Sequence, residues 1–142
     1  MRIFFYTLFC AAGLLFSCSG STGNNSSGNT TNAADTGKSV IVFTEYEHHF
    51  GKVEEGKKVN CTFFFENTGT GNLVIQSAIT TCGCTASKYD RKPIAPGKGG
   101  EIEVEFDTSG RNGIQTKTIT VKSNASVPTV ILKITADVAT KS

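Results

Sequence analysis

Apolar and polar residues alternate in short runs from Val40 to the C-terminus. In residues 101–106, three glutamates alternate with Ile102, Val104 and Phe106, so we expect the carboxylates to face water and the apolar side chains to face a core. The same period of two predicts further inward-facing residues: Val59, Cys61, Phe63, Phe65, Ile119, Val121, Val130, Leu132, Ile134 and Ala136.

Turn-forming residues separate these runs. Residues 67–72 read Asn-Thr-Gly-Thr-Gly-Asn, and residues 73–75 restart a strand. After residue 18 the only leucines are Leu73 and Leu132, and valine, isoleucine, threonine and phenylalanine dominate, so no helix is predicted. We therefore expect an all-β domain over residues 40–139, a single β-sandwich of about seven antiparallel strands.

The N-terminus has the pattern of a bacterial lipoprotein signal peptide over residues 1–17. Arg2 precedes an apolar run over residues 3–16, which is shorter than the ~20 residues that a membrane-spanning helix needs. Residues 15–18, Leu-Phe-Ser-Cys, resemble a lipobox, although Phe16 is larger than usual at its position. We expect a lipid on Cys18 and a domain in the periplasm, anchored to a membrane of a Gram-negative envelope; an uncleaved anchor or a plain secretory signal is the alternative.

Behind the lipobox, residues 18–39 consist mostly of Gly, Ser, Thr and Asn. Such a segment buries too little apolar surface to offset its ordering entropy, so we expect a disordered tether. The formal charge of +2 falls to +1 when Arg2 leaves with the signal (2 − 1 = 1). A nearly neutral domain gives no electrostatic argument for binding nucleic acid.

After the lipid-bearing Cys18, the mature chain has three cysteines: Cys61, Cys82 and Cys84. The compartment expected for this protein is oxidising, and three cysteines can form at most one internal disulfide. Cys61 lies on the apolar face of its run and is expected to be buried. Cys82 and Cys84 are separated by Gly83, and a disulfide between them would need a bent backbone. This pair is interpreted as structural, with thiol redox exchange or copper or zinc binding as the alternative.

The ordered set of motifs resembles the bacterial family called domain of unknown function (DUF) 1573. The resemblance covers roughly residues 42–138 and is carried by residues 48–53, Gly56, residues 63–69, 73–75, 82–85, 96–99 and 123–124. It implies an immunoglobulin-like sandwich similar to the abnormal-spindle/hydin and major-sperm-protein group, in a secreted or lipid-anchored protein without an established activity. His49 departs from the family pattern, where an acidic residue is expected.

Two glycine motifs are interpreted as structural. Phe50-Gly51 is expected to combine a buried aromatic ring with a positive φ in a turn between the first strands. Pro96-Gly97 suits a type II turn that leads into the strand over residues 101–106. The glycines of residues 97–100 precede a strand rather than a helix, which argues against a phosphate-binding loop.

No arrangement of residues predicts catalysis, and we expect no cofactor. His48 and His49 are adjacent, so in a strand they face opposite ways and cannot easily chelate one ion together. The function expected from the sequence is a non-enzymatic binding or scaffolding module that presents a β-surface or an edge strand to an envelope protein or peptide. Redox or copper/zinc handling through Cys82 and Cys84 is the alternative function.

Overall fold

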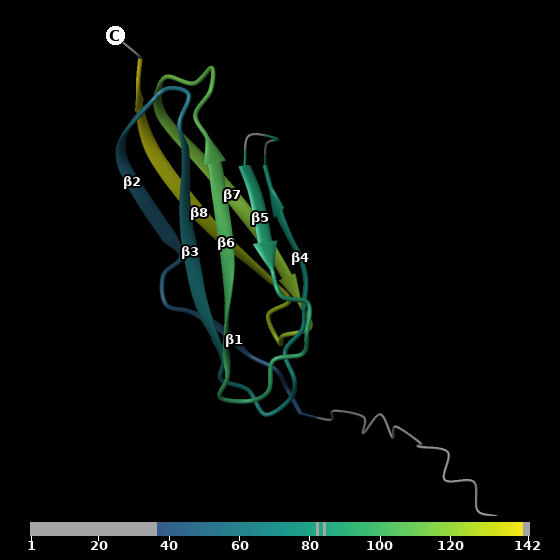
Figure 1. Ribbon diagram of the computed structural model, residues 1–142. Coiled ribbons are helices and arrows are strands. Elements are labelled where there is room, and N and C mark those ends of the chain that lie inside the picture. The colour runs from purple at the N-terminus through teal and green to yellow at the C-terminus, as the bar shows by residue number, and fades with distance from the viewer. Residues whose placement is uncertain (1–36, 82, 84, 141–142) are drawn as a thin grey trace, which may run out of the picture. The chain divides into compact units, whose positions relative to one another are not determined.

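The computed structural model describes residues 37–81, 83 and 85–140, which form two four-stranded sheets (Figure 1). The first sheet has the order β1-β3-β6-β5 and the second the order β2-β8-β7-β4. The strands are β1 (Ile41–Phe43), β2 (Glu47–Glu54), β3 (Lys58–Asn67), β4 (Ile75–Thr80), β5 (Thr85–Tyr89), β6 (Gly99–Asp107), β7 (Gly113–Ser123) and β8 (Thr129–Ala139). The described part of the chain contains no helix, and so none that could span a bilayer.

The core lies between the two sheets and follows the predicted alternation. In β6 the side chains of Ile102, Val104 and Phe106 are buried, while the glutamates between them face outward. Phe63 in β3 and Leu132 in β8 are completely buried. The all-β sandwich is therefore confirmed, and each sheet contributes its inward-facing residues to one apolar layer.

Two details of the predicted topology are wrong. There are eight named strands rather than about seven, and β2 pairs with β8 in parallel rather than antiparallel fashion. The reason is that only three residues separate β1 from β2, so the chain passes from the first sheet to the second without reversing direction. It therefore meets the C-terminal strand running the same way.

The two predicted glycine motifs differ in outcome. Gly97 has a φ of 70°, and the Lys98 N–H donates to the Ala95 carbonyl (3.1 Å), which is the geometry of a type II turn with Pro96 at its second position. Gly51 also has a φ of 70°, but it lies inside β2 at a bulge and not in a turn. Phe50 is half-buried against the core at this bulge.

A buried asparagine at the end of β3 organises the following loop. The Asn67 side chain, 0% exposed, donates from Nδ2 to the carbonyls of Gly71 (2.8 Å) and Ile94 (2.9 Å). Its Oδ1 accepts the N–H of Gly69 (3.0 Å) and of Val40 (3.3 Å). This side chain thus ties the loop to the start of β1, a role beyond the turn that the Asn-Thr-Gly sequence predicts.

The segment before β1 is bonded to loops of both sheets. The Lys38 carbonyl accepts the N–H of Thr70 (2.8 Å), and the Ser39 carbonyl accepts the N–H of Ser126 (2.9 Å). A Cβ at Gly69 would overlap the Lys38 carbonyl oxygen, so this crossing requires glycine. Lys38 and Ser39, which we assigned to the linker, therefore belong to the folded domain.

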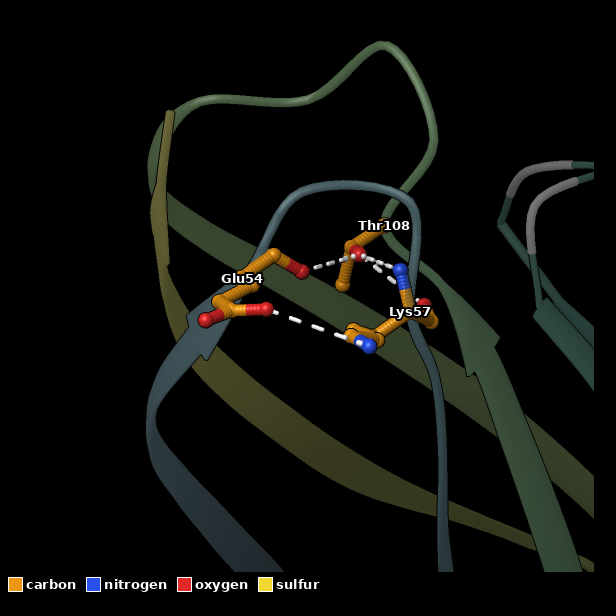
Figure 2. Close-up of polar contacts among 3 residues, drawn as sticks. All are labelled: Glu54, Lys57 and Thr108. Atoms are coloured by element: carbon orange, nitrogen blue, oxygen red, sulfur yellow. Dashed lines mark hydrogen bonds and ion pairs between the residues drawn. The ribbon is translucent and has the colours of Figure 1, made fainter. Parts of the chain in front are cut away.

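A single hydroxyl closes the end of the sandwich where β2 turns into β3 and β6 ends (Figure 2). Thr108, 0% exposed, accepts the Lys57 N–H at its Oγ1 (2.8 Å), and the carbonyls of Glu54 (2.8 Å) and Lys57 (2.9 Å) lie within reach of its proton. The Lys57 ammonium lies 3.9 Å from the Glu54 carboxylate across the same turn. One threonine at the end of β6 thus provides hydrogen-bond partners for the turn that connects β2 with β3.

Candidate binding site

The edges of the two sheets determine whether a partner strand could add to them. At one side, β4 and β5 are edge strands of opposite sheets and are joined by hydroxyl groups. Thr80 Oγ1 donates to the Thr85 carbonyl (2.7 Å), Ser87 Oγ to the Ala78 carbonyl (2.5 Å) and Tyr89 OH to the Gln76 carbonyl (3.1 Å). These bonds occupy backbone groups that a partner strand would need.

The other two edges are protected differently. Along β2, a bulge interrupts the ladder, and many of the side chains are charged or polar, including Glu47, His49, Lys52 and Glu54. Bulges and charged side chains on an edge strand both discourage the addition of another strand. β1 has only three residues, and Ile41 and Phe43 within it are 8% and 3% exposed. None of the described edges is therefore a long open template, and a sheet face is the better candidate for contact with a partner.

The outward face of the first sheet carries a groove of about 740 Å³ over β1, β3 and β6. We call it the outer groove and define it by six of its lining residues, Val42, Phe64, Glu66, Gly99, Gly100 and Glu101. A second hollow of about 440 Å³ shares Gly99, Gly100 and Glu101 with it and continues toward β5. The groove is open, and the core residues Phe43 and Phe65 also line it.

One glycine at the start of β6, Gly99, contributes to this hollow. Gly99 pairs with Glu66 and Gly100 with Phe65 in the β3–β6 ladder, beyond the residues of β6 that pair with β5. A Cβ at Gly99 would come within 2.9 Å of the Phe65 carbonyl oxygen, and one at Gly100 within 2.6 Å of the Phe65 ring. Gly99 has the outward parity of Glu101, so the absence of a side chain there leaves the outer surface low, whereas Gly100 faces inward and makes room for the buried Phe65 ring.

Two apolar side chains are exposed beside the hollow. Phe64 is 55% exposed and Val42 is 44% exposed. Both occupy outward positions of their strands, between buried neighbours such as Phe63 and Phe65. An exposed phenylalanine in the middle of a sheet has unburied apolar surface that a partner could cover.

The charges of the outer groove are all negative. Its lining contains the carboxylates of Glu66 and Glu101 and no cationic side chain. Farther along the same row of β6, Glu103 lies 3.7 Å from the Lys88 ammonium and Glu105 lies 2.9 Å from that of Lys58. Within residues 37–81, 83 and 85–140, neither Glu66 nor Glu101 has an ion-pair partner.

The histidines do not form a metal site with other described residues. His48 packs its ring against Phe50, with centroids 4.8 Å apart, and its Nδ1 lies 3.4 Å from a Glu45 oxygen. His49 is exposed and lies 3.4 Å from a Glu47 oxygen. No group of three histidine, cysteine or acidic side chains suited to a metal occurs among the residues that the structure describes.

The cysteines fall into two classes. Cys61 is buried in β3, as the alternation predicts, and burial raises the pKa of its thiol to about 12, with the nearby Glu45 carboxylate adding to the rise. This thiol stays protonated at neutral pH and is a poor nucleophile. Cys18, Cys82 and Cys84 lie outside the described residues. Their lipid, disulfide, redox and metal roles stay predictions, for which thiol counts before and after mild reductant, with copper and zinc contents, are the first measurement.

Sequence reasoning did not single out the outer groove. The signal that could have revealed it is Phe64, a large aromatic residue at a position where the period of two in β3 calls for a polar one. The glycines of residues 97–100 were used only as an argument against a phosphate-binding loop. The effect of Gly99 on the surface depends on its pairing with β3, which lies more than thirty residues earlier in the chain.

Comparison with solved structures supports the immunoglobulin-like fold. A protein of unknown function from Porphyromonas gingivalis W83 has a TM-score of 0.64 at 19% identity, over 77% of this chain and 51% of that one. The ASH / PapD-like domain 7 of human CEP192 has a TM-score of 0.56 at 10% identity, over 72% and 87%. The secreted serine protease VesC of Vibrio cholerae has a TM-score of 0.55 at 12% identity, over 69% and 23%.

The chain thus spans about half of the P. gingivalis protein and about a quarter of the protease. At such low identities the likeness shows the fold alone. None of the curated proteins compared with this sequence matches it. A family model described as a protein of unknown function matches residues 41–138, nearly the whole described domain. The chain belongs to the DUF1573 family, and its domain is an immunoglobulin-like β-sandwich.

Proposed function

We propose that this protein is a non-enzymatic binding module of the Gram-negative cell envelope, held at a membrane by a lipid on Cys18. Its periplasmic domain would bind a segment of a partner protein in the outer groove. The observation that carries this proposal is the exposed Phe64 beside the outer groove. The protected edges favour contact through this face over addition of a strand.

The energetics of such contact are reasonable for a binding module. Covering a phenylalanine side chain that is now 55% exposed contributes part of the ~1.5–3 kcal/mol associated with full burial of a large apolar side chain. Backbone groups of the paired strands below need no rearrangement, because β1, β3 and β6 already form a ladder. A partner segment would therefore meet a preformed surface, which lowers the entropic cost of binding.

Site-specific photocrosslinking in cells tests the proposal. A photoreactive phenylalanine analogue is placed at position 64, and a matched control at Ile131, an apolar residue 60% exposed on the outer face of the second sheet. We expect position 64 to crosslink one defined envelope protein, with the attachment mapped by mass spectrometry to one short segment. Crosslinking from position 131 should not give that product.

The result that contradicts the proposal is equally specific. If position 64 gives no product, or the same products as position 131, the outer groove is not the binding surface. Phe64→Ala provides a second measurement, because it removes exposed apolar surface without touching the core. The purified variant should unfold at the same temperature as the wild type and lose binding of the segment identified by crosslinking.

A further inference from the structure

We infer that the segment bound in the outer groove is basic, with lysine or arginine side chains next to apolar ones. This inference rests on the proposed function and specifies the chemistry of the partner. It follows from the pairing of charged and apolar residues across β1, β3 and β6.

Each exposed apolar residue of the groove lies directly opposite a carboxylate. Val42 pairs with Glu66 across β1 and β3, and Phe64 pairs with Glu101 across β3 and β6. Directly paired residues project from the same face of a sheet, with Cβ atoms about 4.5–5.5 Å apart. A ligand that covers either apolar side chain is therefore brought close to a negative charge.

A lysine or arginine side chain matches this arrangement in a single residue. Its aliphatic stem can cover the Phe64 ring while its charged end reaches the Glu101 carboxylate. A cation placed over the face of an aromatic ring gains a further electrostatic attraction. An apolar neighbour in the segment could then cover Val42, beside Glu66.

The row of glutamates on β6 shows that the groove differs from the rest of the sheet. Glu103 and Glu105 face Lys88 and Lys58, so their charges are already balanced. The charge of Glu101 and that of Glu66 are not balanced by any described cation. An acidic segment would meet two uncompensated carboxylates here, whereas a basic one would supply the missing partners.

Peptide binding to the purified domain tests this inference. Fluorescent peptides in which valine alternates with lysine, glutamate or serine are titrated by fluorescence anisotropy. We expect the lysine peptide to bind most tightly and its affinity to fall as salt rises from low ionic strength to about 0.15 M. Glu66→Gln and Glu101→Gln should each weaken it about two- to fivefold, as for exposed ion pairs.

Glu103→Gln is the matched control, because it lies in the same row but is paired with Lys88. It should change the affinity by less than twofold. If the serine peptide binds as tightly as the lysine peptide, if no peptide binds, or if the control weakens binding as much as Glu101→Gln, the inference is wrong.

The two proposals fail in different ways. A product from position 64 whose mapped segment lacks lysine and arginine would leave the outer groove as the binding surface and overturn only the basic partner. Absence of any position-specific product would overturn the outer groove itself. The glutamine variants change exposed side chains, so their thermal unfolding should match that of the wild type and exclude misfolding as a cause.

Discussion

Thr108 illustrates how one buried side chain can hold together the turn at one end of this sandwich. Its hydroxyl satisfies the Lys57 N–H and reaches two carbonyls of the turn between β2 and β3 (Figure 2). Thr108→Val keeps the shape but removes the acceptor of the part-buried Lys57 N–H, so we expect a loss of about 0.5–1.5 kcal/mol in the free energy of unfolding. Chemical denaturation measures this, and Thr116→Val at an exposed position of β7 should change it little.

Cys61 presents the opposite case, a buried residue whose environment is apolar. It shares the inward face of β3 with Phe63 and Phe65. Cys61→Ser would place a hydroxyl among these rings and should lower the free energy of unfolding by about 1–3 kcal/mol. In the native wild type, the high pKa and burial of this thiol should make alkylation slow; rapid labelling of Cys61 would contradict its placement in the core.

At the scale of elements, the contact between the segment before β1 and the loop after β3 depends on the absence of a side chain. Gly69→Ala would drive a methyl group into the Lys38 carbonyl and displace the start of β1. We expect a loss of about 1–3 kcal/mol in stability, as for other overpacked sites, and a lower melting temperature. Gly83→Ala is the control, since its Cβ would meet nothing within 4 Å; an equal loss there would refute the explanation.

The pairing of β2 with β8 should depend on pH through Glu47. The hydrogen bond from Lys133 Nζ to Glu47 Oε2 (2.8 Å) lowers the pKa of this carboxyl below its ordinary value of 4.5, and the charges of Lys133 and His49 add to the effect while desolvation opposes it. A lowered folded-state pKa means that the carboxylate stabilises the fold above pH 4.5 and ceases to do so as the pH falls through the lowered value.

The wild type should therefore be more stable than Glu47→Gln at neutral pH, and the difference between their melting temperatures should disappear in acid. Thermal unfolding across this pH range measures it. Glu101→Gln serves as the control, because Glu101 has no cationic partner within the described ranges. A difference that persists unchanged in acid would show that the Glu47 charge is not its source.

The local alternation of apolar and polar residues was sufficient to predict the strands that have one buried and one exposed face. The alternation in β6 and β8 identifies their buried residues, and Pro96-Gly97 identifies a turn from the conformational preferences of two residues. The parallel pairing of β2 and the bulge at Gly51 could not be predicted, because they depend on how the chain crosses between sheets. The outer groove likewise arises only when β1, β3 and β6 align.

At the scale of the whole molecule, the proposed lipid on Cys18 would determine where the domain works. Cys18→Ala should abolish acylation, and the protein should then be released from membranes or stall before processing. Fractionation of cells with mass spectrometry of the N-terminus measures both outcomes. A variant that still partitions with membranes in an acylated, processed form would overturn the expected localisation.

The bonds before β1 also have a mechanical consequence. Figure 1 shows that the described segment before β1 and the end of β8 lie at opposite ends of the sandwich. A pull on the chain ahead of Lys38 reaches the loop after β3 through Thr70 and the loop after β7 through Ser126 before it reaches β1. We therefore expect the load to be divided between both sheets, so that the domain resists tension as a unit rather than opening first at its shortest strand, β1.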